Sequence, residues 1–188
     1  MARWSKTEAG WQSGAVGRSD GALRLRPLRL EDEAVFRAAH EAMAEEGFAF
    51  GLGFEPDEPF QGYVARLAGY RCGIDLPERW VPSTFLVAEV GGEVVGRSSI
   101  RHELNDFLAH EGGNIGYGVR PEHRLRGYAS EILRQSLIIA RSLGIGRALL
   151  TCDETNTGSV RVIEGCGGVL ESTVDGEKGD RVRRYWID

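Results

Sequence analysis

A helix with one apolar face, set between two strand-like segments, constrains the fold of this 188-residue chain more than any other feature. Before the helix lies the strand pattern Asn114–Val119, and after it the nearly continuous apolar run Ala148–Cys152, typical of a strand buried on both faces. The helix itself is indicated by apolar residues at positions 129, 132, 133, 137, 140 and 143, and Gly144 ends it. Two strands joined through a helix form a parallel crossover. The crossover is therefore where we look for chemistry.

The remaining segments place this crossover in a mixed α/β domain. A hairpin is indicated by two β-rich runs that meet at Gly91–Gly92. Further helices are expected over about 31–46, 60–71 and 159–164, and strands over 22–28, 84–90, 94–104, 168–174 and 181–187. Residues 1–21 show no periodicity, so we expect a flexible N-terminal arm followed by a single domain over residues 22–188.

Composition excludes several classes of function. The chain carries 23 Lys and Arg against 28 Asp and Glu, a net charge of −5, which has the wrong sign for a protein whose main partner is nucleic acid. No apolar stretch is long enough for a membrane span or for a secretory signal, so we expect a cytoplasmic protein. Cys72, Cys152 and Cys166 are widely spaced, and neither a disulfide framework nor a metal site is indicated.

The segment between the first strand of the crossover and its helix has the properties of an anion site. Free N–H groups and the positive end of the helix dipole lie at a helix N-terminus, and Gly127 permits close approach of the backbone. An ordinary turn with solvated basic residues is the alternative. The residues expected to contact the anion are Val119, Arg120, Arg124, Leu125, Arg126, Gly127, Tyr128, Ala129 and Ser130.

Two blocks of sequence resemble the GNAT superfamily of N-acyltransferases. Arg124–Ala129 is similar to the loop that binds the pyrophosphate of acyl-CoA, with the pattern Arg/Gln-x-x-Gly-x-Gly/Ala. Asn156–Gly168 is similar to the Asn-x-x-Ala/Ser turn and helix of the family, which implies that Asn156 and Ser159 contact the pantetheine arm. The order of the elements also matches, and three further segments are similar to a bacterial subgroup of predicted acetyltransferases without assigned substrates: 100–105, 112–121 and 151–153.

The resemblance implies a fold and a reaction. The fold is a mixed, mostly antiparallel sheet of about seven strands with helices on both faces, and its parallel pair splays apart to admit acetyl-CoA. Acetyl-CoA is then a co-substrate, no metal takes part, and the thioester carbonyl lies against backbone N–H groups near Tyr117 while an amine attacks directly. Many members use a tyrosine as the proton donor where this chain has Ile163, and the usual Gly-Phe after that helix is Gly167–Gly168.

Three side chains are candidates for the chemistry. His102 is the candidate general base, because its ordinary pKa lies near working pH; a structural hydrogen bond is the alternative. Its neighbour Glu103 must point to the opposite face of the strand. Tyr117 is a candidate acid or orienting group, or else a packing residue. Cys152 invites a ping-pong mechanism, but a small apolar residue in a buried strand is the preferred interpretation.

An acidic segment suggests the acceptor. Residues 31–60 hold nine Asp and Glu and a single Arg or Lys, and the resemblance implies that this region covers the acceptor site. Glu41 and Glu45 share one helix face, and Phe50, with Phe48 and Phe54, is expected in a mobile apolar wall. We therefore expect a small cationic amine as acceptor. Protein N-terminal or lysine acetylation and a non-catalytic acyl-CoA-binding module are the alternatives, and the choice between monomer and homodimer stays open.

Overall fold

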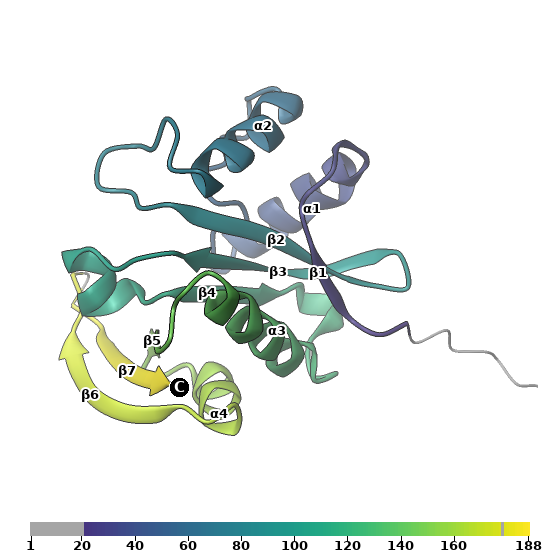
Figure 1. Ribbon diagram of the computed structural model, residues 1–188. Coiled ribbons are helices and arrows are strands. Elements are labelled where there is room, and N and C mark those ends of the chain that lie inside the picture. The colour runs from purple at the N-terminus through teal and green to yellow at the C-terminus, as the bar shows by residue number, and fades with distance from the viewer. Residues whose placement is uncertain (1–20, 178) are drawn as a thin grey trace, which may run out of the picture.

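The computed structural model describes residues 21–177 and 179–188, and seven strands in this part of the chain form two sheets (Figure 1). The expected arm, residues 1–21, lies outside the described residues except for Gly21. The first sheet has the order β1-β2-β3-β4 and is antiparallel throughout: β1 (Arg24–Arg26), β2 (Ser83–Val90), β3 (Glu93–Arg101) and β4 (Ile115–Val119). The second, also antiparallel, has the order β5-β7-β6: β5 (Ala148–Asp153), β6 (Val169–Asp175) and β7 (Arg181–Ile187).

Helices cover both faces of the first sheet, as predicted (Figure 1). On one face lie α1 (Glu33–Ala44), which follows the 3₁₀ turn η1 (Leu30–Asp32), and α2 (Phe60–Arg71). On the other lies α3 (Tyr128–Ser142), and α4 (Thr157–Gly165) packs beside it. Two short turns flank β4: the π-helical η2 (Leu108–Gly112) and the 3₁₀ turn η3 (Pro121–His123). No helix of the described residues is long and apolar enough to cross a bilayer.

An aromatic cluster joins α1 and α2 to the first sheet. Phe36 lies at its centre, with ring centroids 5.0 Å from Phe54 and 5.5 Å from Phe50. Phe36 and Phe50 are completely buried, and Tyr63 accepts a hydrogen bond from the Leu52 backbone N–H through its hydroxyl (3.0 Å). Phe50 and Phe54 are therefore core residues and do not form the mobile wall expected from their glycine-rich surroundings.

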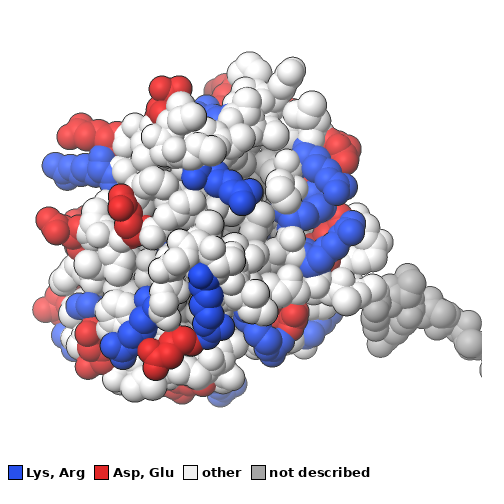
Figure 2. All heavy atoms as spheres, in the orientation of Figure 1, with Lys and Arg blue, Asp and Glu red and all other residues white. Residues whose placement is uncertain are grey.

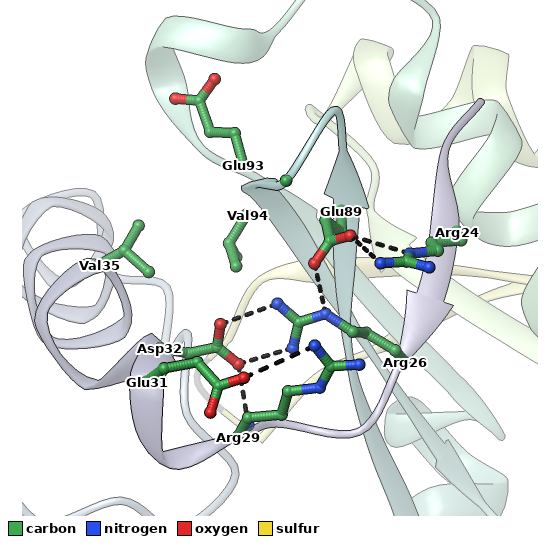
Figure 3. A pocket seen from close by; sticks show the side chains of 10 residues that line it. Arg24, Arg26, Arg29, Glu31, Asp32, Val35, Glu89, Glu93 and Val94 are labelled. Atoms are coloured by element: carbon green, nitrogen blue, oxygen red, sulfur yellow. Dashed lines mark hydrogen bonds and ion pairs between the residues drawn. The ribbon is translucent and has the colours of Figure 1, made fainter. Parts of the chain in front are cut away.

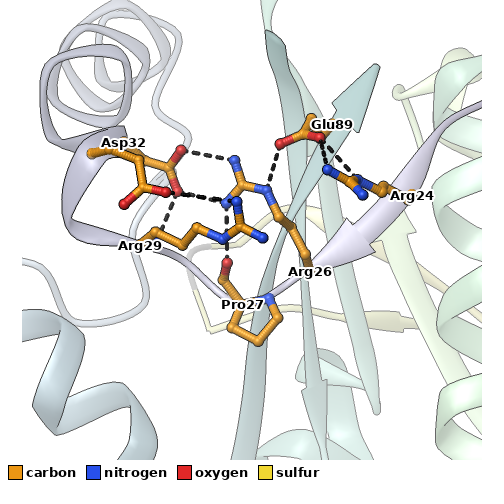
Figure 4. Close-up of polar contacts among 7 residues, drawn as sticks. Arg24, Arg26, Pro27, Arg29, Asp32 and Glu89 are labelled. Atoms are coloured by element: carbon orange, nitrogen blue, oxygen red, sulfur yellow. Dashed lines mark hydrogen bonds and ion pairs between the residues drawn. The ribbon is translucent and has the colours of Figure 1, made fainter. Parts of the chain in front are cut away.

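A charged network fixes the entry of the chain into α1 (Figures 3 and 4). The buried Arg26 guanidinium donates to Asp32 (2.6 and 2.8 Å) and to Glu89 (2.6 Å), so it joins β1 to η1 and to β2. Burial opposes ionisation of Asp32, but hydrogen bonds from Arg26 and from the Arg29 backbone hold the pKa of Asp32 below its ordinary value. The surface hollow beside this network is lined by Arg24, Arg26, Asp32 and Glu89, which are already paired with one another.

The two sheets meet at Asn114, the residue before β4. Its backbone N–H donates to the Leu149 carbonyl (2.7 Å), and its side-chain Oδ1 accepts from the Leu149 N–H (2.9 Å). Its Nδ2 donates to the Arg101 carbonyl (3.3 Å). Among the described residues, no backbone hydrogen bond joins β4 to β5 beyond this point. The strands of the crossover therefore start together and then separate.

Gly113 makes this junction sterically possible. It has φ +65°, and a Cβ at this position would lie 2.8 Å from the Leu149 carbonyl oxygen. A larger residue would push β5 away from Asn114. The expected architecture, a mostly antiparallel arrangement of seven strands with a splayed parallel pair, is confirmed. The seven strands form two hydrogen-bonded sheets, and β4 and β5 are joined only at their start.

We predict that Asn114→Ala lowers the free energy of unfolding by about 1–3 kcal/mol, because the buried Leu149 N–H loses its acceptor. Denaturant unfolding measures this loss. Ser142→Ala is the control, because its hydroxyl donates to the Ile139 carbonyl at the exposed end of α3, where water can replace the bond. Equal losses in the two variants would contradict the role assigned to Asn114.

Candidate functional site

A cleft of about 780 Å³ lies where β4 and β5 separate. One wall is the end of α1 and the residues after it (Met43, Glu46, Gly47 and Phe48), and another is β4 with the following loop (Tyr117, Gly118, Val119, His123, Arg124 and Leu125). The N-terminal turn of α3 and the region from β5 to α4 close it. On the face of the molecule in Figure 2, acidic and basic side chains are interspersed.

The N-terminus of α3 presents free backbone donors to this cleft. Gly127 precedes the helix with φ +81°, and no side chain caps the first turn. A Cβ at Gly127 would meet no atom within 4 Å, so the space beside the backbone is open. Uncapped N–H groups at the positive end of a helix dipole favour an anion. The site therefore has the geometry expected of a phosphate-binding turn.

Most of the residues predicted to bind the cofactor line the cleft. They are Val119, Arg124, Leu125, Gly127, Tyr128, Ala129, Ser130, Asn156 and Ser159. Arg120 does not: its side chain turns back onto β3, where it donates to the Val94 carbonyl (2.6 Å) and pairs with Glu122 (2.5 Å). Arg126 is exposed and donates to the Glu122 carbonyl (3.2 Å). The side chains of both arginines thus lie outside the cleft, contrary to the prediction.

Arg124 is held by an acidic residue inside the cleft. Its guanidinium donates to the Val119 carbonyl (3.1 Å) and, through both terminal nitrogens, to Glu46 (3.1 and 2.5 Å). The hydrogen bond from Arg124 lowers the pKa of Glu46. Glu46 is the member of the acidic segment that lines the cleft, whereas Glu41 and Glu45 are exposed and lie outside it. The prediction that Glu41 and Glu45 contact the acceptor is therefore not supported by their positions.

The predicted Asn-x-x-Ser block forms the start of α4. Asn156 caps the helix, with its Oδ1 accepting from the Ser159 N–H (3.0 Å). Ile163, at the position of the family's tyrosine, is buried in the core between α3, α4 and β5. No side chain of α4 at that position can therefore supply a proton.

Tyr117 reaches the cleft from β4. Its hydroxyl is buried and has no hydrogen-bond partner of good geometry among the described residues. Burial raises the pKa of the Tyr117 phenol above its ordinary value, against a smaller lowering by the nearby Ser159 hydroxyl. The group is thus a neutral O–H donor at working pH, located beside the N-terminus of α4.

His102 lies away from the cleft. It follows the end of β3, and its Nε2 is 2.9 Å from the Thr84 hydroxyl, with which it forms a hydrogen bond. Burial and the nearby Arg71 charge lower the pKa of His102. The proposed base is thus a structural histidine. Because β3 runs antiparallel to β4 and Ile100 pairs with Ile115, His102 lies past the start of β4, at the end opposite to the anion turn that follows Val119.

Several residues of the cleft were missed by sequence reasoning. Phe48 packs on Gly118, where a Cβ would lie 2.7 Å from its ring. Asp153, Gly158, Arg161 and Val162 also line the cleft. A pattern of residue types gives no signal for them, because they meet only when α1, β5 and α4 converge. Within residues 21–177 and 179–188, no group of three or more acidic, His or Cys side chains is arranged to hold a metal ion.

Comparison with protein families gives a match over most of the chain. Residues 22–169 match the family model described as an acetyltransferase (GNAT) domain. A comparison with curated protein sequences found no match.

Solved structures share the fold. RimJ from Mycobacterium smegmatis in complex with CoA-disulfide is 20% identical with a TM-score of 0.64, and the match covers 89% of this chain and 82% of RimJ. The yncA protein of Salmonella typhimurium with acetyl-CoA is 17% identical with a TM-score of 0.60, over 89% and 94% of the two chains. A chimera of the spermidine N-acetyltransferase SpeG from Vibrio cholerae is 20% identical with a TM-score of 0.60, over 88% and 94%.

We predict that Glu46→Gln strengthens the binding of CoA roughly two- to fivefold, the range expected of an exposed ion pair. The substitution removes a negative charge from the cleft and frees the Arg124 guanidinium for an anion. Isothermal titration with CoA measures the change. The control is Glu45→Gln, which neutralises an exposed neighbour outside the cleft and should leave the affinity unchanged. Weaker binding to Glu46→Gln would contradict the assignment of Arg124 to the anion.

Proposed function

The chain belongs to the GNAT acetyltransferase family, and we propose that it transfers the acetyl group of acetyl-CoA to a primary amine that attacks the thioester directly, in the cleft between β4 and β5. The observation that carries this assignment is the single junction at Asn114. Beyond it the two strands part and leave a cleft, which ends at the uncapped N-terminus of α3.

The residues present fit acetyl-CoA. The pyrophosphate would be held by the N–H groups of 127–130 and by the Arg124 guanidinium, which together supply the positive field that a diphosphate requires. The pantetheine arm would lie along the free edge of β4, with Asn156 and Ser159 on its other side. When bound, acetyl-CoA supplies an activated acyl group, and the chain supplies position, polarity and a proton.

We propose that Tyr117 donates its proton to the departing thiolate and regains one, through water in the cleft, from the amine nitrogen as that nitrogen is acylated. The Tyr117 O–H is buried, neutral and without a protein acceptor of good geometry, so its proton is available in the cleft. Since burial raises its pKa above the ordinary value near 10, the donor stays protonated through the neutral and mildly alkaline range. In this chain the donor would come from β4, whereas many members of the family supply it from α4.

Direct attack is favoured over an acyl-cysteine intermediate. Burial raises the pKa of the Cys152 thiol to about 11, so the nucleophilic thiolate is scarce at neutral pH. Cys152 also packs against the core cluster that includes Leu150 and Ile163, as a small apolar residue would. These two observations support transfer in one step from thioester to amine.

The class of acceptor is a further part of the proposal. The acidic segment predicted a cationic amine, but Glu46 is its only member lining the described cleft, and Arg124 neutralises it. The segment therefore contributes little to the attraction of a cation. We assign a primary amine as the reacting group, and either a small molecule or a polypeptide can carry it.

The function is tested by thiol release from acetyl-CoA over a panel of small amines, together with intact-mass measurements on candidate proteins. We expect release that depends on an amine, with a gain of one acetyl group by the acceptor. Gly127→Asp is the negative control: it places a negative charge in the open space beside the α3 N-terminus and should abolish CoA binding. Tight binding of acetyl-CoA without release for any acceptor would instead indicate a binding module.

We predict that Tyr117→Phe lowers kcat by about 10²-fold while the affinity for CoA stays unchanged, because only the proton donor is lost. Cys152→Ala is the matched comparison and should keep most of the activity, because no covalent intermediate is formed. Steady-state kinetics with CoA titrations measure both variants. A fully active Tyr117→Phe enzyme would assign the proton donor elsewhere, and an inactive but folded Cys152→Ala enzyme would overturn direct attack.

A further inference from the structure

Two arginines of β3 lie together under β4 without an acidic partner. Arg97 and Arg101 are four residues apart on one strand, so their side chains leave the same face of the sheet. Both reach Gly116 of β4: a Cβ at Gly116 would lie 2.9 Å from Nη1 of Arg101 and 3.4 Å from Nη1 of Arg97. Among the described residues, no carboxylate forms an ion pair with either guanidinium.

Arg97 is held by neutral groups alone. Its guanidinium donates to the Ala49 carbonyl (2.8 Å), the Gly116 carbonyl (3.1 Å) and the Ser99 hydroxyl (3.0 Å), and it stacks on the Phe48 ring at 4.5 Å. Its Nε is buried without a partner. Burial and the neighbouring Arg101 charge lower the pKa of Arg97 to about 9. Arg97 is therefore fixed in place, and its charge is not compensated.

Arg101 is the free member of the pair. Arg101 is half-buried, its guanidinium makes no hydrogen bond to any described residue, and its Nη1 is buried without a partner. Burial lowers the pKa of Arg101. A guanidinium has five donors in a planar fork, a geometry that matches a carboxylate. Nothing in the described protein uses this fork.

Two neighbouring guanidinium groups without a carboxylate lower the stability of the fold unless a ligand compensates their charge. Burying a charge without a partner is strongly unfavourable, and two like charges side by side add repulsion. Elsewhere the chain avoids this cost: the buried Arg26 has both Asp32 and Glu89 as partners (Figure 4). A buried donor without an acceptor calls for an explanation, and a bound anion is one that also removes the repulsion.

The pair lies next to the cleft, on the face of β4 that Gly116 and Gly118 share. Gly116 and Gly118 are two residues apart on one face of β4, a separation of about 7 Å. Gly118 lines the cleft, as does Phe48, and Phe48 contacts both Gly118 and Arg97. An amine at the thioester and an acidic group at Arg101 therefore fit within one small molecule.

We propose that Arg101, positioned beside Arg97, binds an anionic group of the acceptor, so that the substrate is a small amine that also carries a carboxylate or another compact oxyanion. The inference rests on the proposed acetyl transfer and adds the class of its substrate. Gly116 contributes by having no side chain, since a Cβ there would meet the Arg101 guanidinium. The amine reacts with the thioester, while the oxyanion is recognised and stays chemically unchanged.

The test compares matched acceptors at saturating acetyl-CoA by thiol release. The panel is the twenty common L-amino acids, each with its carboxamide, and two aminoalkylphosphonates that distinguish a carboxylate from a tetrahedral oxyanion. We expect acid-bearing amines to be preferred over their carboxamides by about tenfold or more in kcat/KM. Arg101→Gln should remove this preference through KM for the acid-bearing acceptor, leaving the carboxamide and the affinity for CoA unchanged.

Two variants keep the test specific. Arg71→Gln removes an exposed positive charge at the end of α2, near enough to His102 to affect its pKa, but makes no contact with Gly116; it should keep the preference. Arg101→Lys keeps the positive charge but loses the planar set of guanidinium donors, so it should keep part of the preference for acid-bearing amines. It can be measured in place of Arg101→Gln if that variant does not fold.

The outcomes separate the two proposals. If the protein fails to bind CoA and no amine accelerates thiol release, the proposed acetyl transfer itself is contradicted. CoA binding with acetylation of carboxamides as fast as of acids, or with no acid-bearing amine acetylated, would overturn the anion site and leave acetyl transfer standing. An equal loss for acids and carboxamides in Arg101→Gln would also overturn it, by making Arg101 a structural residue.

Discussion

The contact between Asn114 and Leu149 is the constraint on which the rest of the structure depends. It satisfies the backbone of both strands at one point and ties β3 to the same point through the Arg101 carbonyl. Because the strands bond only there among the described residues, the free edges beyond it face one another across a cleft. The α3 helix follows β4 and leads to β5, so its N-terminus lies at the mouth of that cleft. A sheet bonded along its full length would have no such opening.

The charges of the chain are divided by role. Arg26 is buried between two carboxylates and holds β1, η1 and β2 together. Arg124 pairs with Glu46 at the exposed mouth of the cleft, where an incoming phosphate can compete for it. Arg97 and Arg101 have no carboxylate partner among the described residues and lie against Gly116 of β4, next to the cleft. We therefore propose Arg97 and Arg101, rather than the acidic segment 31–60, as the charged groups that select the acceptor.

Periodicity was sufficient for the helices and strands of the crossover and for α2, whereas the splayed sheet was expected from the resemblance to the GNAT superfamily. The helix predicted over 60–71 is α2 with the same bounds, and the crossover 114–119, 129–143 and 148–152 matches β4, α3 and β5 to within one residue at each end. These elements are set by local spacing of apolar residues. The anion turn was also readable, because Gly127 and the helix start are adjacent in sequence. Sequence alone did not indicate which way a side chain turns: Arg120 turns onto β3, and His102 turns to Thr84.

The segment 31–60, which holds the aromatic and acidic residues, shows the same limit of prediction from sequence. Phe50 and Phe54 stand among glycines typical of a mobile loop, yet Phe36 and Tyr63 bring them into the core. Arg97 and Arg101 gave no signal, because an arginine on a strand is usually solvated or paired, and only the fold shows that no carboxylate of the described chain reaches them. Long-range packing decides these cases.

The central claim is that the free edge of β4 and the α3 N-terminus bind acetyl-CoA. Amide hydrogen exchange with and without CoA tests it most directly, because the N–H groups concerned are themselves observed. The account predicts increased protection over 115–119 and 127–130, with β1 and α2 unchanged. Binding of CoA with no added protection in 115–119 and 127–130, or with protection confined to other segments, would contradict it.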